Sequence, residues 1–282
     1  MKEGINFSAA KKFIFKMTLH DISAVTACNF LYLRSGLSRV KIKDAMNKGA
    51  FWIKNKRGKL RRLRRATTRL NAGDHIEFYY DKRLLSIKPP YARCISDLKH
   101  YSVWFKPAGL MSQGTMYGDH CSLMRQAELF FRNSREIFLV HRLDREASGP
   151  MLLAHTKDAA ARLSKLFQDN RIIKRYQAEV LGKPEVKGEN LVIDFPLDGK
   201  SAVTGYEVVS YNPETNTSLV NVIIKTGRLH QIRRHFDMIG FPVMGDPKYG
   251  KGNKNTEGMK LSAVSLRFKC PFQKREVEFT TL

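Results

Sequence analysis

One short loop carries the strongest signal in this chain. Its residues 141–149 are His141-Arg142-Leu143-Asp144-Arg145-Glu146-Ala147-Ser148-Gly149. Apolar runs at 137–140 and 151–154 flank the loop, so we expect two short strands to hold it at both ends. Loops on rigid supports are where catalytic side chains concentrate. Asp144 lies between two arginines, which favour the charged form of a carboxylate; a surface ion-pair cluster at a strand end is the alternative interpretation.

Two more stretches could carry chemistry. Residues 226–235 are Thr226-Gly227-Arg228-Leu229-His230-Gln231-Ile232-Arg233-Arg234-His235. They follow a predicted strand and open a predicted helix, where a glycine and basic side chains are suited to holding a phosphate. A plain basic amphipathic helix is the alternative. Tyr176 lies beside cations in another predicted strand and, taken alone, is an ordinary half-buried strand tyrosine.

The elements around these stretches predict an α+β fold. We expect strands at residues 101–106, 137–140, 151–154, 173–181, 205–211, 219–225 and 264–268, and helices at 122–131, 157–168 and 229–239. The strand–helix–strand alternation of a doubly wound sheet is absent from this pattern. The sheet is therefore expected to be antiparallel or mixed.

The whole chain is strongly basic. Its 282 residues suggest two domains and hold 50 Lys and Arg against 26 Asp and Glu, a net charge of +24. Such a field attracts polyanions, with nucleic acid ahead of a membrane surface. No apolar run reaches the roughly 18 residues of a spanning helix and no charged-then-apolar leader opens the chain, so we expect a cytoplasmic protein. The four cysteines are scattered without a Cys-x-x-Cys motif, so we expect reduced thiols and no zinc site.

Most of the excess charge lies in the first third. Residues 1–90 hold 21 Lys and Arg against 6 Asp and Glu, and Pro89-Pro90 at their end indicates a linker at about 84–97. We therefore predict a small domain at 1–90 and a larger one at 97–282. In the small domain we expect an apolar helix within 22–33, a helix at 39–48, and strands at 50–54 and 75–80 that form a small hairpin.

A dense set of cations surrounds this hairpin. Its members are Lys54, Lys56, Arg57, Lys59, Arg61, Arg62, Arg64 and Arg65. They are too close together to be neutralised locally, so we expect them on a solvent face. A patch that contacts RNA phosphates, through the five arginines, is favoured over a surface that merely keeps the protein soluble.

The small domain resembles the RNA-binding module named after ribosomal protein S-four, also called the alpha-L module. The resemblance rests on Leu37-Ser38-Arg39 entering a helix, Lys48-Gly49 before a strand, and Ala72-Gly73-Asp74-His75-Ile76 near the end. The pattern is degenerate, because the usual Val-Asn-Gly turn is here Lys54-Asn55-Lys56-Arg57-Gly58.

Taken together, the stretches at 141–149, 174–178 and 226–235 resemble the RluA-type family of RNA pseudouridine synthases. Two flanking stretches, Phe105-Lys106-Pro107-Ala108-Gly109 and residues 240–250, extend the resemblance over about residues 97–282. It implies a central antiparallel or mixed sheet with a cleft, flanked by helices. An N-terminal RNA-binding module is a frequent partner in this family.

The resemblance also implies roles for single residues. Asp144 matches the catalytic aspartate, Arg233 the arginine that pairs with it, and Tyr176 the aromatic residue that stacks on the target base. Arg142 matches the side chain that fills the space left by the flipped nucleotide. Lys106 with Pro107 matches a motif that packs beneath the site.

Five further positions follow from the resemblance with less detail. Arg228 and His230 are expected to contact RNA near the site. Ala147 and Leu229 stand where the family usually has threonine, and Pro150 where it has an aliphatic residue. Because none of these hydroxyls is needed for the chemistry, we expect altered substrate choice or loop geometry rather than lost activity.

These residues suit the conversion of uridine to pseudouridine, which breaks the bond between base and sugar and reattaches the base through a carbon. The target base must leave the stack. The enzyme then needs an ionised carboxylate beside the ribose, a flat surface against the freed uracil, and exclusion of water. The sequence leaves open whether Asp144 attacks the sugar or removes a proton from it. No metal or cofactor is implied, since no ligand cluster, glycine-rich phosphate loop or dinucleotide fingerprint occurs.

Large-subunit ribosomal RNA is the favoured substrate, because of the positive field and the ribosomal-type module, with transfer RNA as the second candidate. A monomer is expected. A non-catalytic RNA-binding or ribosome-assembly protein on the same fold would have a disabled aspartate loop. A metal-dependent RNA hydrolase would need clustered carboxylates, whereas Asp144 has only Glu146 nearby.

Overall fold

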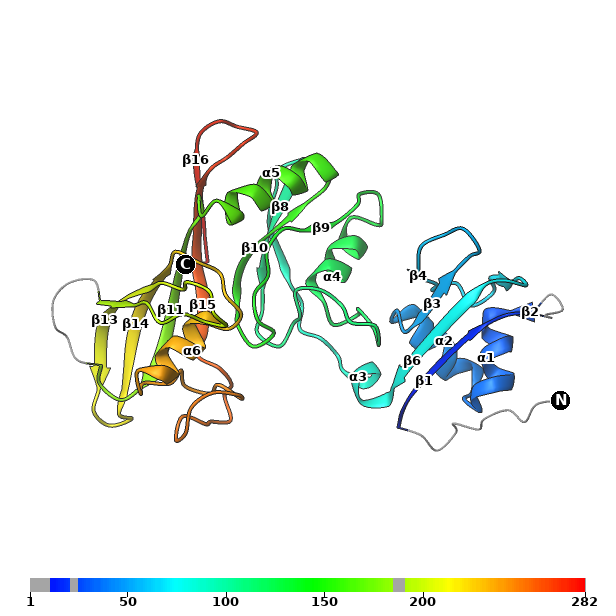
Figure 1. Cartoon of the computed structure of the whole chain (residues 1–282), viewed down its shortest axis with the longest axis horizontal. Helices are drawn as coiled ribbons and strands as arrows, with labels where there is room; N and C mark the ends of the chain where they lie inside the picture. Colours follow the sequence, from blue (N-terminus) through cyan, green and yellow to red (C-terminus); the bar gives the residue numbers. More distant parts are fainter. Residues whose placement is uncertain (1–10, 21–24, 185–190, 282) are drawn as a thin grey trace. The chain divides into compact units, whose positions relative to one another are not determined.

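The computed structural model of the chain describes residues 11–20, 25–184 and 191–281 (Figure 1). Its contacts divide the chain into two compact units. Unit 1 comprises residues 1–89 and 113–125, and unit 2 comprises residues 90–112 and 126–282. The segment 113–125 lies within the larger predicted domain by sequence, but its contacts place it in unit 1.

Unit 1 is built on a four-stranded antiparallel sheet with the strand order β1-β6-β3-β4. Its strands are β1 (Lys12–Thr18), β3 (Phe51–Lys54), β4 (Arg61–Arg62) and β6 (His75–Asp81). The helices α1 (Ala27–Ser35) and α2 (Arg39–Asn47) share one apolar core with this sheet. The shorter elements are the paired strands β2 (Val25–Thr26) and β5 (Arg69–Leu70) and the helix α3 (Lys82–Ser86).

Local sequence sets the ends of the two helices. Ser38 caps α2 by accepting a hydrogen bond from the Lys41 backbone N–H, and Gly36 ends α1 in the left-handed conformation at φ 68°. Leu31 and Ile42 are both fully buried, so each helix has an apolar side against the sheet. The predicted apolar segment at 22–33 lies partly outside the described residues, and its described part forms α1 from Ala27 onward.

The segment 113–125 is fixed to unit 1 by polar and aromatic contacts. The Asp119 backbone N–H donates to the Lys48 carbonyl at 2.9 Å, and Trp52 Nε1 donates to the Met116 carbonyl at 2.9 Å. The ring of Tyr117 packs edge-on against Tyr79, with 5.5 Å between centroids. The segment therefore contributes its own residues to the structure of unit 1.

Unit 2 contains two sheets whose strands are paired antiparallel. One has the order β7-β8-β10-β9 and the other β12-β13-β14-β11-β15-β16. The first is made of β7 (Arg93–Asp97), β8 (Tyr101–Lys106), β9 (Phe138–Leu139) and β10 (Gly149–Ala154). The second is made of β11 (Ile173–Leu181), β12 (Leu191–Ile193), β13 (Thr204–Asn212), β14 (Thr217–Ile224), β15 (Leu261–Lys269) and β16 (Glu276–Thr280).

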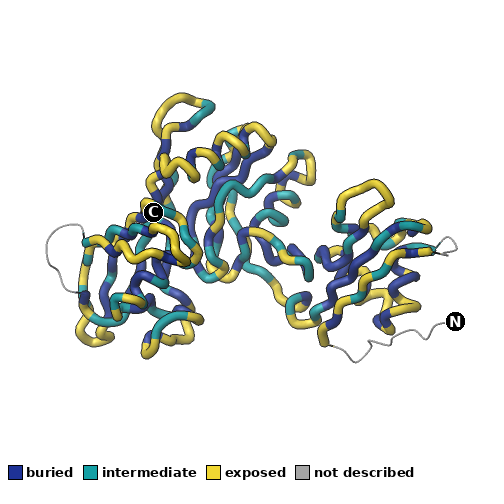
Figure 2. Tube along the Cα trace, viewed as in Figure 1, coloured by how far each residue is buried: buried dark blue, intermediate teal, exposed yellow. Residues whose placement is uncertain are grey.

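Two helices cover these sheets and close their cores. Helix α5 (Lys157–Gln168) shares a core with β8, β10 and β15, and α6 (Gln231–Met238) shares a second core with β11 and β14. Figure 2 shows that the buried positions follow the strands and the inner sides of these helices. The remaining helix is α4 (Leu123–Phe130), whose first residues belong to the segment 113–125.

The two sheets of unit 2 meet where β10 begins. Ser148 forms an isolated parallel bridge with Ser262, and the Ala263 N–H donates to the Ser148 carbonyl at 2.8 Å. Gly149 follows at φ 133°, and a Cβ there would lie 2.3 Å from the Ala263 carbonyl oxygen. Only glycine allows this approach, so the junction fixes one end of the loop 141–149.

The predicted α+β fold with an antiparallel or mixed sheet is confirmed, and the paired strands of the described residues are antiparallel. Residues 93–97, which fall in the predicted linker at 84–97, instead form β7 and pair with β8. The strands β1, β2, β4, β5, β12 and β16 were not predicted either. Within the described parts of the chain, none of the helices is both long enough and apolar enough to cross a bilayer.

Candidate active site

Asp144 lies in the loop between β9 and β10, and two neighbouring backbone segments hold this loop. Ser112 Oγ donates to the Leu143 carbonyl at 2.6 Å and accepts from the Leu143 N–H at 3.0 Å. The Gly109 N–H donates to the Arg145 carbonyl at 2.7 Å. The backbone on both sides of Asp144 is therefore anchored, and its side chain is left 22% exposed.

The fully buried ammonium group of Lys106 also holds this loop, through hydrogen bonds to its backbone. Lys106 Nζ lies 2.6 Å from the Ala147 carbonyl and 2.7 Å from the Leu110 carbonyl, with the Pro107 and Arg145 carbonyls at 3.1 and 3.3 Å. Burial lowers the pKa of Lys106 to about 8, although the nearby carboxylates oppose this shift. Four carbonyl dipoles therefore satisfy this cation, in agreement with the expected packing role of the Lys-Pro motif.

Arg233, which lies 89 residues after Asp144 in the sequence, holds the Asp144 carboxylate in place. Its Nη1 donates to Asp144 Oδ2 at 2.9 Å, while Nε and Nη2 donate to the two oxygens of Asp246 at 2.7 and 2.8 Å. Arg233 is 2% exposed and Asp246 fully buried. Burial alone would lower the pKa of Arg233, but its hydrogen bonds to both carboxylates outweigh burial and raise it. The guanidinium is thus permanently charged and locked in one orientation.

Asp246 is the anchor of this arrangement. Besides binding Arg233, its Oδ1 accepts from the backbone N–H groups of Lys248 and Tyr249 at 2.8 and 3.0 Å. Burial would raise the pKa of Asp246, yet these hydrogen bonds lower it, so the carboxylate is ionised. Sequence reasoning did not single out Asp246, although it lies in the stretch 240–250 that carried part of the resemblance.

His230 approaches the other oxygen of Asp144. Its Nε2 lies 3.8 Å from Asp144 Oδ1, and its Nδ1 lies 3.0 Å from the Tyr249 hydroxyl. Burial, helped by the Arg233 charge, lowers the pKa of His230, whereas Asp144 opposes the shift. At neutral pH the ring is therefore mainly uncharged, and Tyr249 is a second contact that sequence reasoning missed.

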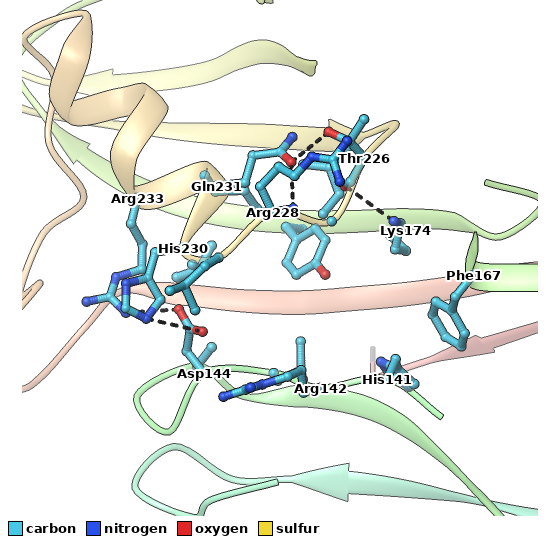
Figure 3. A pocket seen from close by; sticks show the side chains of 18 of the residues that line it. His141, Arg142, Asp144, Phe167, Lys174, Thr226, Arg228, His230, Gln231 and Arg233 are labelled. Carbon is cyan, nitrogen blue, oxygen red and sulfur yellow. Dashed lines mark hydrogen bonds and ion pairs between the residues drawn. The ribbon is translucent and has the colours of Figure 1, made fainter. Parts of the chain in front are cut away.

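A cavity of about 600 Å³ opens in front of Asp144, a size typical of small-ligand sites (Figure 3). The predicted residues that line it are Asp144, Tyr176, Arg142, Arg228, His230 and Arg233. Tyr176 comes from β11, where it pairs with Val222 on one side and Ala263 on the other. Burial and the Asp144 charge raise the pKa of Tyr176, so its ring is a neutral phenol.

The loop before α6 is held by one glutamine. Gln231 Oε1 accepts from the Thr226 hydroxyl at 2.7 Å and from the Arg228 N–H at 3.0 Å, while its Nε2 donates to the Val203 carbonyl at 3.0 Å. Arg228 Nε donates to the Ser201 carbonyl at 2.9 Å. Arg142, in contrast, is exposed at the cavity. Of the two arginines, Arg142 is thus the more available to a ligand.

The five predicted arginines of unit 1 separate into two groups. Arg57, Arg61 and Arg65 are exposed, as expected. Arg62 and Arg64 instead turn to the protein: Arg62 Nε lies 3.1 Å and Arg64 Nη2 2.5 Å from Asp119 Oδ2. Their side chains are only 17% and 24% exposed, so the expectation that local crowding keeps all five on a solvent face is wrong for these two.

The reason is a distant carboxylate. Asp119 lies more than fifty residues after both arginines and reaches them through the segment 113–125. Arg62 also stacks on Trp52, with 4.2 Å from its guanidinium carbon to the ring centroid. Counting charges along the sequence could not show this pairing. Across residues 11–20, 25–184 and 191–281, no group of three or more His, Cys, Asp or Glu side chains is placed to hold a metal ion.

Comparison with known proteins gives the family. The family described as RNA pseudouridylate synthase matches residues 100–238. The ribosomal large subunit pseudouridine synthase D of Zymomonas mobilis is 34% identical over 166 residues, which cover 50% of this chain and 51% of that protein. The match thus spans about half the length of this relative. The dual-specificity RNA pseudouridine synthase RluA of Vibrio vulnificus is 32% identical over 203 residues, covering 64% of this chain and 79% of that protein.

Solved structures agree on the fold. Human RNA pseudouridylate synthase domain containing 1 superposes with a TM-score of 0.58 at 22% identity, over 70% of this chain and 86% of that one. At this identity the likeness speaks for the fold alone. The family match and the Vibrio vulnificus relative, of which this chain covers 79%, show that the chain belongs to the RluA-type family of RNA pseudouridine synthases.

Proposed function

We propose that this protein isomerises specific uridines in RNA to pseudouridine. One observation supports the proposal above all others: a carboxylate, Asp144, faces a nucleotide-sized cavity together with an aromatic ring, and a buried guanidinium fixes it. Each group meets one need of the reaction. The isomerisation breaks the N1–C1′ bond, forms a C5–C1′ bond and moves one proton from C5 to N1, so no co-reactant is consumed.

The proposed mechanism begins with base flipping, because neither the glycosidic bond nor C5 can be reached inside a helix. The ring of Tyr176 stacks against the flipped uracil, an interaction worth about 1–3 kcal/mol. Arg142, exposed at the cavity, fills the space that the base leaves. Ordering the base against a wall of the cavity also keeps it beside the ribose after the bond has broken.

Asp144 acts on the ribose as an ionised carboxylate. Arg233 holds one oxygen at 2.9 Å and leaves the other, Oδ1, toward His230. The charge pair is preorganised by Asp246, so the carboxylate does not have to reorient when the reaction begins. The same geometry serves attack on C1′ and removal of a ribose proton, since both need a fixed, charged oxygen beside the sugar.

We propose large-subunit ribosomal RNA as the substrate. The exposed arginines Arg57, Arg61 and Arg65 of unit 1 supply a surface for RNA phosphates, and a relative is named for the ribosomal large subunit. The resemblance of residues 1–90 to the ribosomal-type RNA-binding module supports the same choice. Transfer RNA is the second candidate substrate.

Site-resolved mapping of pseudouridine in total RNA tests the proposal. RNA from a strain that lacks the gene is compared with RNA from the parent and from a strain that carries the gene on a plasmid. A ribosomal uridine that loses its modification and regains it on complementation supports the proposal. Loss only in transfer RNA would overturn the substrate choice, and an unchanged map would favour a non-catalytic RNA-binding protein.

A further inference from the structure

Lys174 is a buried cation in the cavity that the proposed reaction does not use. It is 7% exposed and lines the same cavity as Asp144. Side chains alternate along β11, so Lys174 lies on the same face as Tyr176, about 6.6 Å along the strand. Figure 3 shows it on the opposite side of the cavity from Asp144, with Phe167 and His141 nearby.

This ammonium has almost no partner in the protein. Its one hydrogen bond, to the Thr226 carbonyl, is long at 3.4 Å, and no carboxylate of the described residues lies within ion-pair distance. Lys106 is a useful comparison, because it is also buried but has four carbonyl oxygens, two of them within 2.7 Å. A buried charge without a partner is costly, and burial lowers the pKa of Lys174. Its missing partner is therefore to be sought in a ligand.

The approach to Lys174 Nζ is kept open by a glycine. A Cβ at Gly227 would lie 3.9 Å from Nζ, in van der Waals contact, so a larger side chain at this position would be placed next to the ammonium. The adjoining wall is formed by His141, whose ring stacks on Phe167 with centroids 4.3 Å apart. His141 Nε2 accepts from the Leu152 N–H at 2.9 Å, which places the proton of the neutral imidazole on Nδ1. This side of the cavity thus offers a cation and a neutral histidine.

We propose that Lys174 binds a phosphate of the RNA backbone next to the flipped uridine. That the phosphate belongs to RNA rests on the proposed function. That Lys174 binds an anion rests on the geometry of the cavity. A nucleotide whose base stacks on Tyr176 has its own phosphates within one nucleotide length, which matches the spacing of the two side chains along β11. An ammonium is a compact point charge suited to a phosphate oxygen. The bound phosphate replaces the partner that Lys174 lacks and fixes the ribose relative to Asp144.

The test uses Lys174→Met, which keeps the shape and removes the charge. Two measurements are made on the full chain: KM and kcat for a synthetic RNA hairpin that carries the mapped uridine, and the melting temperature in potassium phosphate against potassium chloride at matched ionic strength. Lys269→Met, a change of an exposed lysine on β15, is the control. In a second variant, Gly227→Val, the new side chain lies next to Nζ and leaves the lysine in place.

We expect Lys174→Met to raise KM about tenfold with kcat within about twofold. Phosphate should raise the melting temperature of the wild type and of Lys269→Met but not of Lys174→Met. In chloride, Lys174→Met should melt no lower than the wild type, because it removes an unpartnered buried charge. Gly227→Val should raise KM in the same way.

Two results would overturn the proposed phosphate site. The first is a Lys174→Met variant whose KM and phosphate response equal those of the wild type. The second is a Lys174→Met variant that melts at a lower temperature in chloride with unchanged KM, which would assign Lys174 a structural role. If the wild type forms no pseudouridine, the proposed function fails separately. A phosphate response that is abolished only in Lys174→Met would still support the anion site in that case.

Discussion

Arg233 in unit 2 and Arg57 in unit 1 both lie in strongly basic stretches, yet their surroundings differ completely. Arg233 is 2% exposed and has a carboxylate on each edge of its guanidinium. Arg57 lies on an exposed turn between β3 and β4. The charge of Arg233 is therefore a fixed part of a reactive geometry, whereas that of Arg57 belongs to a diffuse field. Single substitutions should have large, specific effects in the first region and small, additive effects in the second.

The largest effect is expected for Asp144→Asn. The change keeps the shape of the side chain but removes the charge that acts on the ribose, so pseudouridine formation should fall at least about a thousandfold. RNA affinity, measured by filter binding, should stay within about threefold, because the surface of unit 1 is untouched. Glu146→Gln, two residues along the same loop, is the control and should stay within about threefold in rate. Normal product yield from purified Asp144→Asn would contradict the assignment of the site.

The second largest effect is expected at Asp246, the buried carboxylate that anchors Arg233. Asp246→Asn leaves the buried Arg233 with only one carboxylate, which should cost about 3–5 kcal/mol in the free energy of unfolding, measured by urea denaturation. The rate should fall as well, since Arg233 no longer has a fixed orientation. The matched control is Asp198→Asn, because Asp198 pairs with Arg234 but is 68% exposed. That change should cost less than about 1 kcal/mol. Equal losses in the two variants would remove the distinction between a buried and an exposed pair.

A third prediction concerns acid. Burial, with a smaller effect of the Lys174 charge, lowers the pKa of His141 to about 3, whereas an unfolded histidine has a pKa near 6.5. The unfolded state therefore binds one more proton between these values, and stability falls as the pH drops below about 6.5. Between pH 7 and 5 this group should cost about 2 kcal/mol of unfolding free energy. His141→Gln cannot titrate, so its loss over the same range should be smaller by that amount. Parallel curves for the two proteins would show that His141 is not kept neutral.

The smallest effects are expected in unit 1. Arg57→Gln, Arg61→Gln and Arg65→Gln should each weaken RNA binding a few-fold and lower the slope of log affinity against log salt by about 0.7–0.9 for each phosphate that the variant no longer neutralises. Arg62→Gln with Arg64→Gln should instead mainly lower the melting temperature, because both side chains pair with Asp119. A salt slope that changes equally in both sets would mean that the pairing with Asp119 does not withhold these arginines from RNA.

The regular elements of the fold could largely be predicted, because their signals are local. The helix at 157–168 and the strand at 173–181 have the bounds that the apolar pattern predicts. Several strands at the edges of the sheets were not predicted. In β1 the apolar residues Phe13, Ile14 and Phe15 follow one another, so strict alternation is absent, and β16 is a short edge strand of mixed polarity. β1 is a strand because it pairs with β6, far along the chain, whereas β16 pairs with the preceding strand β15. In both cases the pairing, rather than an alternating apolar pattern, makes the segment a strand.

The site was predictable only in part, for the same reason. Residues 141–149 and 226–235 show polar groups at the ends of elements, but nothing in either stretch indicates that Asp144 and Arg233 meet; that expectation came from the resemblance. Asp246 and Lys174 could not be found from sequence, because their meaning depends on burial. In the sequence, Asp246 cannot be told from any other aspartate, although its carboxylate binds three neighbours. Lys174 likewise cannot be told from the other lysines of this basic chain, although it has almost no partner.

The segment 113–125 sets a practical limit on dissecting this molecule. A gene fragment that stops at residue 90 would encode Arg62 and Arg64 but omit their counter-ion, Asp119, and would also omit the carbonyl that receives the indole of Trp52. Such a fragment exposes two guanidiniums that are paired with Asp119 in the intact protein. Its affinity for nucleic acid would then overstate what the native surface can do, so binding studies of unit 1 should be made on the uncut polypeptide.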